Sequence, residues 1–502
     1  MSQILGTFTA DNYAFSATAK AQNWIAGEWC DARSGETLDV INPRYGKAMS
    51  SVPMSAAPDV AAAVAAARAA WADWKAWPMR ERAHVLYELR RRMEAEREAL
   101  AWLVSHENGK VYAQAVAEVD KAIECVEFGC SLPNMAAGAQ LDVSRGVNCQ
   151  LTHEPLGVVA GVTPFNFPLM VPLWMLPQAL VGGNCFVLKP SEQVPLSMVR
   201  LAELLQESGL PAGVFNLVHG GKDTVEALCD DPGIAALAFV GSTRVARMVY
   251  GRACTAGKRA LCLGGAKNHL IVVPDADLEL TAENVVASFT GCSGQRCMAA
   301  ANLVAVGEVD HIIEAIARRA AKLVPGTDHG AITNAASVER ITGYIAAAEQ
   351  AGAKVLVDGR GKASSESEGG AGYWVGATVI DHVAPGSPAA TEEIFGPVLS
   401  IIRVPNIEAA IAIENSSSYG NASSVYTTSG HVAREVMGRV EAGMCGVNIG
   451  VPVPREPFGF GGWNDSAFGH GNITGWDGFR FWTRPRKVTT KWALQKDQTW
   501  MS

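Results

Sequence analysis

Residues 157–168 read Gly157-Val158-Val159-Ala160-Gly161-Val162-Thr163-Pro164-Phe165-Asn166-Phe167-Pro168, a short apolar run that ends in a turn flanked by prolines. Four further apolar runs follow, and segments of helical length separate them. This alternation predicts right-handed crossovers and a parallel sheet covered on both faces, in a doubly wound nucleotide-binding architecture with ligands at the carboxyl ends of the strands. The later runs are Asn184 to Leu188, Val214 to Val218, Ala235 to Val240 and Arg259 to Leu263, and the expected helices cover 168–182, 195–208, 222–230 and 244–256.

A second alternating block begins at His269, and helices and a hairpin precede the first block. In the second block we expect strands at Asn302 to Val306, near Ile380, at Leu399 to Val404 and at Ala422 to Tyr426, with helices near 309–324, 337–351 and 406–414. Before the first block we expect helices at Pro58 to Ala76, Met79 to His106 and Ala113 to Cys130 and a hairpin strand at Val147 to His153. We also expect a surface loop at Gly359 to Gly372 and a terminal strand at Gly478 to Trp492. An amphipathic terminal strand usually pairs with another element, which favours oligomerisation.

Composition excludes several classes of function. The chain has 502 residues, 48% of them hydrophobic and 18% charged, so more than one domain is expected. A net charge of -8 leaves no basic stripe for nucleic acid. Eleven scattered cysteines without a signal peptide favour a reducing cytoplasm, and no second Cys/His pair completes a metal site. No apolar run is long enough to span a membrane.

The segment Ser288 to Ala299 contains the candidate nucleophile, Cys297, next to Arg296 and close to two glycines. A thiol attacks as the thiolate, and a neighbouring guanidinium favours that form. The alternative is a cysteine that acts only as a small buried hydrophobe.

Other polar groups follow the predicted strands. Asn166 offers an amide N–H for an oxyanion, although an asparagine among prolines also suits a simple turn. Glu192 after the second strand suits the ribose hydroxyls of NAD, or lies in a solvated loop. Gly241-Ser242-Thr243 opens a helix whose N-terminus suits a phosphate, but no G-x-G-x-x-G fingerprint follows a strand. Glu393 either holds a second ribose or belongs to a surface charge pair.

Taken in order, these motifs resemble the aldehyde dehydrogenase superfamily from about Trp24 to Trp492. The resemblance implies a doubly wound NAD-binding domain at 1–133 and 154–263, an α/β catalytic domain at 264–465 and a small β oligomerisation region at 134–153 and 466–502. It makes Cys297 the nucleophile and pairs Asn166 with the Cys297 N–H as the oxyanion hole. The implied assembly is a dimer or tetramer. The implied cofactor-binding residues are Thr163, Phe165, Lys189, Ser191, Glu192, Gln193, Gly241, Ser242, Gly264, Glu393 and Phe395.

One departure narrows the resemblance. Cys262 stands where the superfamily usually has the glutamate that activates the deacylating water, and Ala266 is inserted after the glycine pair. Both features are similar to the methylmalonate-semialdehyde dehydrogenase branch, which transfers its acyl group to coenzyme A. Lys121 stands where an arginine for the substrate carboxylate is expected, and Ala246 replaces a glycine common at the dinucleotide helix.

We therefore expect an NAD-dependent, CoA-acylating oxidation of methylmalonate or malonate semialdehyde, with Arg296 and Lys121 pairing with the substrate carboxylate. One alternative is a hydrolytic NAD-dependent dehydrogenase that releases a free acid from another short anionic aldehyde. Others are a thiol or serine hydrolase that uses Cys297 or Ser293 with a histidine, and a catalytically silent homologue.

Overall fold

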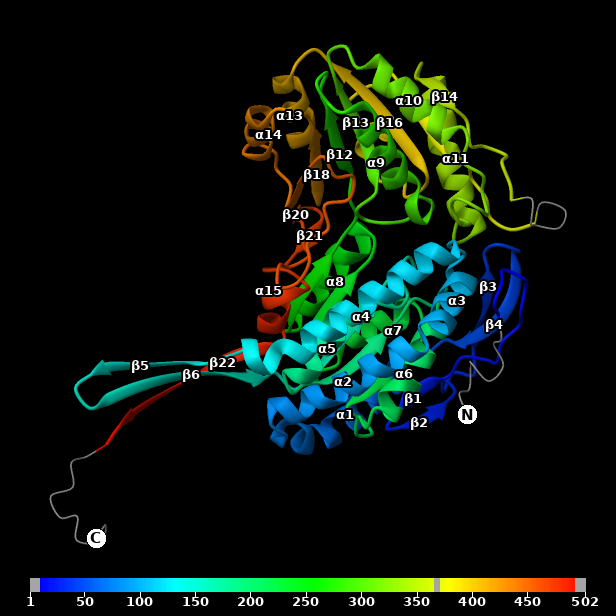
Figure 1. Cartoon of the computed structure of the whole chain (residues 1–502). Coiled ribbons are helices and arrows are strands. Elements are labelled where there is room, and N and C mark those ends of the chain that lie inside the picture. Colours follow the sequence, from blue (N-terminus) through cyan, green and yellow to red (C-terminus); the bar gives the residue numbers. More distant parts are fainter. Residues whose placement is uncertain (1–9, 365–370, 493–502) are drawn as a thin grey trace, which may run out of the picture.

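The computed structural model describes residues 10–364 and 371–492, and Figure 1 shows their arrangement. Part of the predicted surface loop at Gly359 to Gly372 lies outside these residues. No helix in the two described ranges is long and apolar enough to cross a membrane.

The first sheet has the strand order β2-β1-β9-β8-β7-β10-β11-β21. Its five central strands are parallel, as expected. β7 is buried along its whole length because helices cover both faces of the sheet. The chain order reverses between β7 and β10, and doubly wound sheets bind ligands at such a point. The strands are β1 (Asn23–Ile25), β2 (Glu28–Cys30), β7 (Val158–Val162), β8 (Cys185–Lys189), β9 (Phe215–Leu217), β10 (Ile234–Val240), β11 (Arg259–Leu263) and β21 (Ala467–Phe468).

Helices connect the central strands of this sheet, and four N-terminal helices pack beside them. The connecting helices are α5 (Met170–Val181), α6 (Leu196–Glu207), α7 (Lys222–Asp230) and α8 (Thr243–Thr255), and they confirm the expected crossovers. The N-terminal helices are α1 (Ala57–Ala76), α2 (Met79–Ala95), α3 (Arg97–Asn108) and α4 (Tyr112–Met135).

The prediction of one helix from Met79 to His106 was wrong, because the chain leaves helical geometry at Glu96, with φ -106° and ψ 15°. The Glu96 carboxylate pairs with Arg200 of α6, and this long-range ion pair is not visible in a local pattern. The second helix ends at Asn108, two residues beyond the expected His106, and Gly109 follows it in the left-handed conformation with φ 86°.

The second sheet has the order β14-β15-β16-β13-β12-β18-β19, parallel except at the β14 edge. A separate hydrophobic cluster lies on each of its faces. Its strands are β12 (Asn268–Val272), β13 (Ala300–Val306), β14 (Lys354–Val357), β15 (Thr378–Asp381), β16 (Val398–Val404), β18 (Ala422–Tyr426) and β19 (Met444–Val447). The helices around it are α9 (Leu278–Thr290), α10 (Asp310–Ala320), α11 (Ala335–Gln350), α12 (Pro388–Thr391), α13 (Ile407–Asn415) and α14 (Gly430–Met437).

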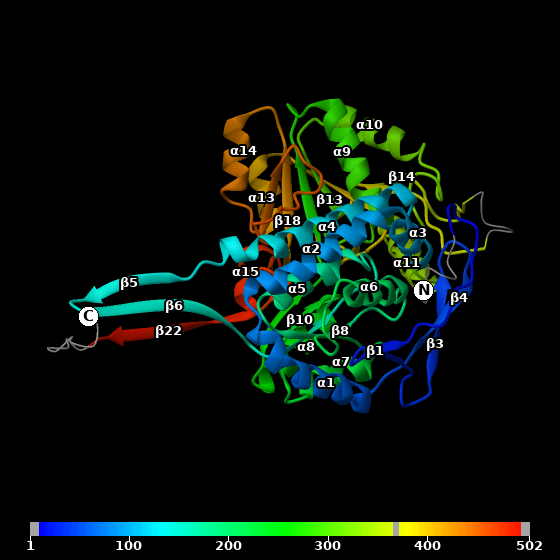
Figure 2. The ribbon, with the colours of Figure 1, turned by 60° about the horizontal axis from the view of Figure 1, so that its bottom comes forward.

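A three-stranded antiparallel arm extends away from the two sheets (Figures 1 and 2). It contains β5 (Ala139–Ser144), β6 (Val147–Pro155) and β22 (Thr483–Lys491), in the order β22-β6-β5. The terminal strand begins later than expected, because residues 478–481 lie in α15 (Gly475–Phe481), where Phe479 and Phe481 are buried in the core. Two small antiparallel pairs complete the described strands, β3 (Thr37–Asn42) with β4 (Lys47–Pro53) and β17 (Tyr419–Gly420) with β20 (Trp463–Asn464).

Candidate active site

Cys297 lies in the connection between α9 and β13, three residues after the end of a short 3-10 turn at Gly291–Gly294. The turn is tight, because Cys292 and Ser293 both have positive φ angles, 52° and 54°. Position 294 requires a glycine because the backbone of Gly396 lies so close that a Cβ at 294 would overlap its carbonyl. The turn thus brings the nucleophile segment against the loop that follows Glu393.

Cys297 and Glu393 line one small cavity of about 20 Å³. Burial raises the pKa of the Cys297 thiol to about 12, and the Glu393 carboxylate raises it further. The N–H groups of Cys297 and Met298 and the Arg296 cation oppose this shift. The Arg296 cation favours the thiolate, as predicted, but desolvation of the sulfur outweighs this charge. The thiolate needs additional stabilisation to form near neutral pH.

The side chain of Arg296 binds the C-terminal end of α9. Its guanidinium donates to the carbonyls of Ala287 and Ser288 at 2.7 and 2.8 Å. Unpaired carbonyls at a helix C-terminus favour such a cation. The structure therefore places Arg296 beside Cys297 but directs two of its hydrogen bonds at the protein backbone.

The loop that carries Asn166 is held by residues that the sequence pattern did not single out as functional. Lys110 and Glu118 form a buried ion pair at 2.5 Å, with side-chain exposures of 1% and 0%. Lys110 Nζ also donates to the Asn166 carbonyl at 2.8 Å, and Asn108 donates to the Phe165 carbonyl at 2.9 Å. Asn108 and Lys110 flank Gly109, and in the sequence alone this tripeptide indicates only a helix end.

Helix α4 links the Asn166 loop to the nucleophile segment. The carboxylate of Glu118 accepts the N–H groups of Leu169 and Met170 at 2.9 and 3.2 Å. One turn earlier, Gln114 accepts the N–H of Cys292 at 3.1 Å. Residues four apart lie on the same helix face, so one face of α4 contacts both segments.

The resemblance implies that Asn166 donates to an oxyanion, and on that expectation Asn166→Ala lowers kcat by about 10²-fold to 10³-fold. The Asn166 side chain is 6% exposed, and its carboxamide has no hydrogen-bond partner among the described residues, so it is available to a ligand. Steady-state kinetics of aldehyde oxidation measure the effect, with Asn148→Ala on the arm as a control. A rise in KM at unchanged kcat would contradict an oxyanion role.

Several residues that are expected to bind the dinucleotide lie where the order of the strands reverses in the first sheet, between β7 and β10. Thr163 follows β7 and Gly241 follows β10, and these two strands are neighbours in the sheet. Ser242 precedes α8, a 13-residue helix with no acidic residue in its first turn, so its N-terminus suits a pyrophosphate. Lys189 and Glu192 pair at 2.8 Å beyond β8, with the Glu192 side chain 29% exposed. These donors and acceptors fit a dinucleotide.

Other expected cofactor residues have partners inside the protein. Gln193 accepts hydrogen bonds from Thr333 and Asn334 at 2.9 and 3.0 Å. Ser191 accepts the N–H of Gln193 at 3.3 Å within its turn. A Cβ at Gly264 would lie 2.7 Å from the carbonyl oxygen of Asp465, so close packing already requires this glycine.

Two aromatic residues from distant segments meet edge to face. The rings of Phe165 and Phe395 are 5.9 Å apart at 82°. Phe395 lines the cavity of Cys297, and Phe165 precedes Asn166 in the chain. The pair therefore connects the Asn166 loop with the cavity.

Lys121 is paired with two carboxylates, Glu124 at 2.9 Å and Glu456 at 3.2 Å. The two carboxylates raise the pKa of Lys121 although burial opposes them. A substrate carboxylate at Lys121 therefore has to compete with Glu456.

Cys262 lies inside the first sheet, between Phe239 of β10 and Phe468 of β21. It is fully buried, and burial raises its pKa, with smaller contributions from the thiols of Cys229 and Cys254. Position 262 does not line the cavity of Cys297.

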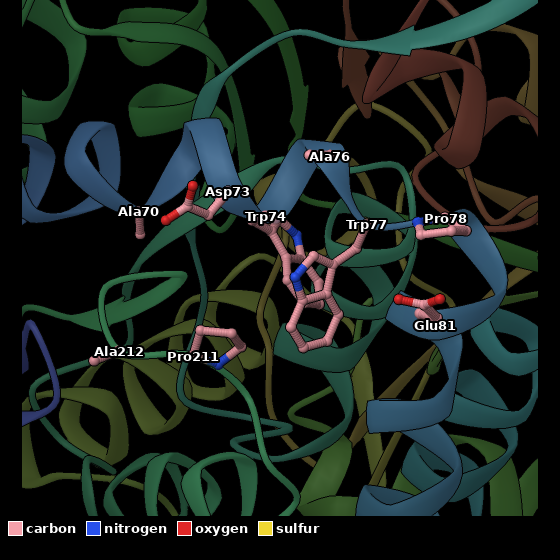
Figure 3. A pocket seen from close by; sticks show the side chains of 9 residues that line it. All are labelled: Ala70, Asp73, Trp74, Ala76, Trp77, Pro78, Glu81, Pro211 and Ala212. Atoms are coloured by element: carbon pink, nitrogen blue, oxygen red, sulfur yellow. The ribbon is translucent and has the colours of Figure 1, made fainter.

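A larger cavity of about 640 Å³ lies at the end of α1 (Figure 3). The indole rings of Trp74 and Trp77 lie in it 5.2 Å apart, with Asp73 and Glu81 at its margin. It shares no lining residue with the cavity of Cys297 and forms no part of that site.

Comparison with known proteins supports one family. The model of the aldehyde dehydrogenase family matches residues 29–488. The chain is 43% identical to malonate-semialdehyde dehydrogenase 2 of Geobacillus thermodenitrificans (strain NG80-2), over 94% of this chain and 99% of that protein. It is also 43% identical to malonate-semialdehyde dehydrogenase 2 of Shouchella clausii (strain KSM-K16), over 94% of this chain and 98% of that protein.

A solved structure shares the fold along nearly the whole chain. The methylmalonate-semialdehyde dehydrogenase of Oceanimonas doudoroffii has a TM-score of 0.92 at 38% identity, covering 95% of this chain and 99% of that one. With a cysteine in a small cavity, a dinucleotide-compatible sheet edge and this full-length similarity, the chain belongs to the aldehyde dehydrogenase family and is an oxidoreductase that acts on aldehydes.

Proposed function

We propose that the protein oxidises malonate or methylmalonate semialdehyde with NAD and transfers the acyl group to coenzyme A, releasing CO2 and acetyl-CoA or propionyl-CoA. The observation that carries this proposal is the 43% identity to a malonate-semialdehyde dehydrogenase over 94% of the chain. NAD as the cofactor is supported by a Sinorhizobium meliloti 1021 protein, assigned as a methylmalonate-semialdehyde dehydrogenase and solved in complex with NAD. That structure has a TM-score of 0.93 at 37% identity, covering 96% of this chain and 99% of that one.

Each residue of the site has a defined task in this proposal. The Cys297 thiolate adds to the aldehyde carbon, and the Asn166 amide and the Cys297 N–H hold the oxyanion. Glu192, Lys189 and Glu393 hold the two riboses, and the N-terminus of α8 holds the pyrophosphate. Bound NAD supplies the hydride acceptor that turns the adduct into a thioester. Lys121 attracts the substrate carboxylate in competition with Glu456, and Arg296 adds its positive charge while it donates to the backbone of α9.

The release of the acyl group distinguishes the proposal from its alternative. Position 262 carries a buried thiol in place of a carboxylate, so no general base at that position activates water. The thiolate of coenzyme A attacks the thioester carbon, and the Cys297 thiolate leaves, so this exchange needs no water. Thiol exchange therefore suits this site better than hydrolysis.

The location and the raised pKa of Glu393 favour a second candidate function, that of a hydrolytic dehydrogenase that releases a free acid. Glu393 lines the cavity of Cys297, and burial raises its pKa to about 7. A carboxyl group with such a pKa is suited to act as a general base near neutral pH.

NADH formation from malonate semialdehyde, followed with and without coenzyme A, separates the two candidates. With coenzyme A we expect continuous turnover. Without it we expect one NADH per site and then a steady rate at least about tenfold lower, because general-base help to water is worth roughly 10²-fold to 10⁴-fold. Equal steady rates in both reactions, with free acid as the product, would favour the hydrolytic candidate.

We also propose that the protein is a homo-oligomer, a dimer or tetramer, that assembles through its arm. The support is the exposure of apolar side chains there, 68% for Leu141, 52% for Val143 and 43% for Val488. Apolar side chains on an edge strand favour pairing with another chain.

A further inference from the structure

The backbone carbonyl of Cys297 accepts hydrogen bonds from two side-chain amides. Asn268 Nδ2 lies 2.7 Å from this oxygen, and Asn421 Nδ2 lies 2.8 Å from it. Both asparagines are buried, each with 6% exposure. A carbonyl oxygen has two lone pairs, so the two donors saturate its capacity.

Strand order explains how two distant asparagines reach one oxygen. Asn268 opens β12 and Asn421 directly precedes β18, and these strands are parallel neighbours. Cys297 shortly precedes β13, the neighbour of β12 on its other side. The amino ends of parallel strands lie at one edge of a sheet, so the three residues meet there.

The orientation of the Asn268 amide is defined by its other partners. Its oxygen accepts the N–H of Ala422 at 3.1 Å, and its Nδ2 also donates to the carbonyl of Ala299 at 2.8 Å. A flipped amide would place its oxygen against two carbonyl oxygens. The donor therefore faces Cys297.

The peptide that receives these two donors joins Cys297, which carries the sulfur, to Met298. The carbonyl of Cys297 and the N–H of Met298 belong to one peptide bond. Burial raises the pKa of the Cys297 thiol, and the N–H of Met298 is one of the groups that lower it. Hydrogen bonds in a chain polarise one another, by roughly 10–30% per bond. Donors on the carbonyl therefore make the N–H a stronger donor to the sulfur.

We propose that Asn268 and Asn421 act as positioning residues that stabilise the Cys297 thiolate through the Cys297–Met298 peptide. The proposal rests on Cys297 as the nucleophile of the proposed function. It adds a source of thiolate stabilisation that neither Arg296 nor the oxyanion hole supplies. Asn268, Asn421 and Met298 are buried and Cys297 is partly buried, so bulk water screens this effect less than it would at the surface.

The test measures how fast iodoacetamide alkylates Cys297 as a function of pH, with the modified peptide identified by mass spectrometry. Asn421→Leu keeps the branched shape of the side chain and removes the donor, whereas Asn421→Gln keeps a donor. Asn302→Leu is the matched control, because Asn302 is a buried asparagine of the same sheet that donates to the carbonyl of Ala390 at 2.8 Å. The assay requires no aldehyde, NAD or coenzyme A, so it is independent of the substrate assignment.

For Asn421→Leu we expect alkylation about threefold to tenfold slower below the thiol pKa and an unchanged limiting rate above it, which is an upward shift of up to about one pKa unit. Asn421→Gln should restore part of the rate, and the control should keep the native profile. Asn268→Leu provides an independent second measurement if Asn421→Leu fails to fold. A native profile in the folded leucine variants, or an equal shift in the control, would overturn the proposal.

Discussion

Cys297→Ala is expected to abolish NADH formation, with kcat lowered by at least about 10⁴-fold, as is usual when a covalent nucleophile is removed. The thiol is the only sulfur among the residues that line the small cavity with Glu393. Without it no thioester forms, and no other side chain of that cavity replaces its chemistry. Steady-state NADH production from malonate semialdehyde with NAD and coenzyme A measures the loss.

Cys292→Ser is the matched control for this prediction. Cys292 is buried in the same segment, but it engages Gln114 through its backbone N–H. We expect this variant to keep most of its activity. Incubation of the native protein with aldehyde and NAD alone should leave an acyl group on Cys297 that mass spectrometry can locate. An adduct on another residue would refute Cys297 as the nucleophile.

Lys110→Met is expected to lower the free energy of unfolding by about 3–5 kcal/mol, because it leaves the Glu118 carboxylate buried without a countercharge. The two side chains are almost fully buried, with exposures of 1% and 0%. The ammonium of Lys110 also lies 4.3 Å from the ring of Phe167, an additional contact that the substitution removes. Urea denaturation followed by circular dichroism measures the change.

The double variant Lys110→Met/Glu118→Gln separates stability from catalysis. A glutamine keeps an acceptor for the N–H groups of Leu169 and Met170 and removes the unpaired charge, so much of the stability should return. The donor to the Asn166 carbonyl remains absent, and we expect kcat to stay reduced. Full recovery of kcat would show that Lys110 contributes only to folding.

Most of the fold was predictable, because it depends on short-range patterns. The apolar runs from β7 to β11 and the helices between them lie where periodicity placed them. The errors lie where a distant contact changes local geometry. Glu96 interrupts a helix to pair with Arg200, and Phe479 and Phe481 form a buried helical turn at the start of the predicted terminal strand.

The sequence predicts which residues form the candidate site, but it says less about how buried and how charged their surroundings are. Sequence motifs predict roles for Cys297, Asn166 and Glu393, and adjacency in the sequence predicts that Arg296 favours the thiolate. Its charge does favour the thiolate, but burial outweighs it and raises the thiol pKa, and the guanidinium binds the end of α9. Electrostatic effects depend on how much water surrounds a group, and the sequence does not report this.

The sequence by itself determined the family, the two alternating blocks and the thiol, because each of these follows from residue order and local periodicity. Only the tertiary structure decided which groups hold the reactive segments. Lys110 reaches Asn166 across 56 residues, and Asn421 reaches Cys297 across 124. Such contacts arise from the order of strands within a sheet and the burial of polar groups that must find partners, and local sequence spacing encodes neither.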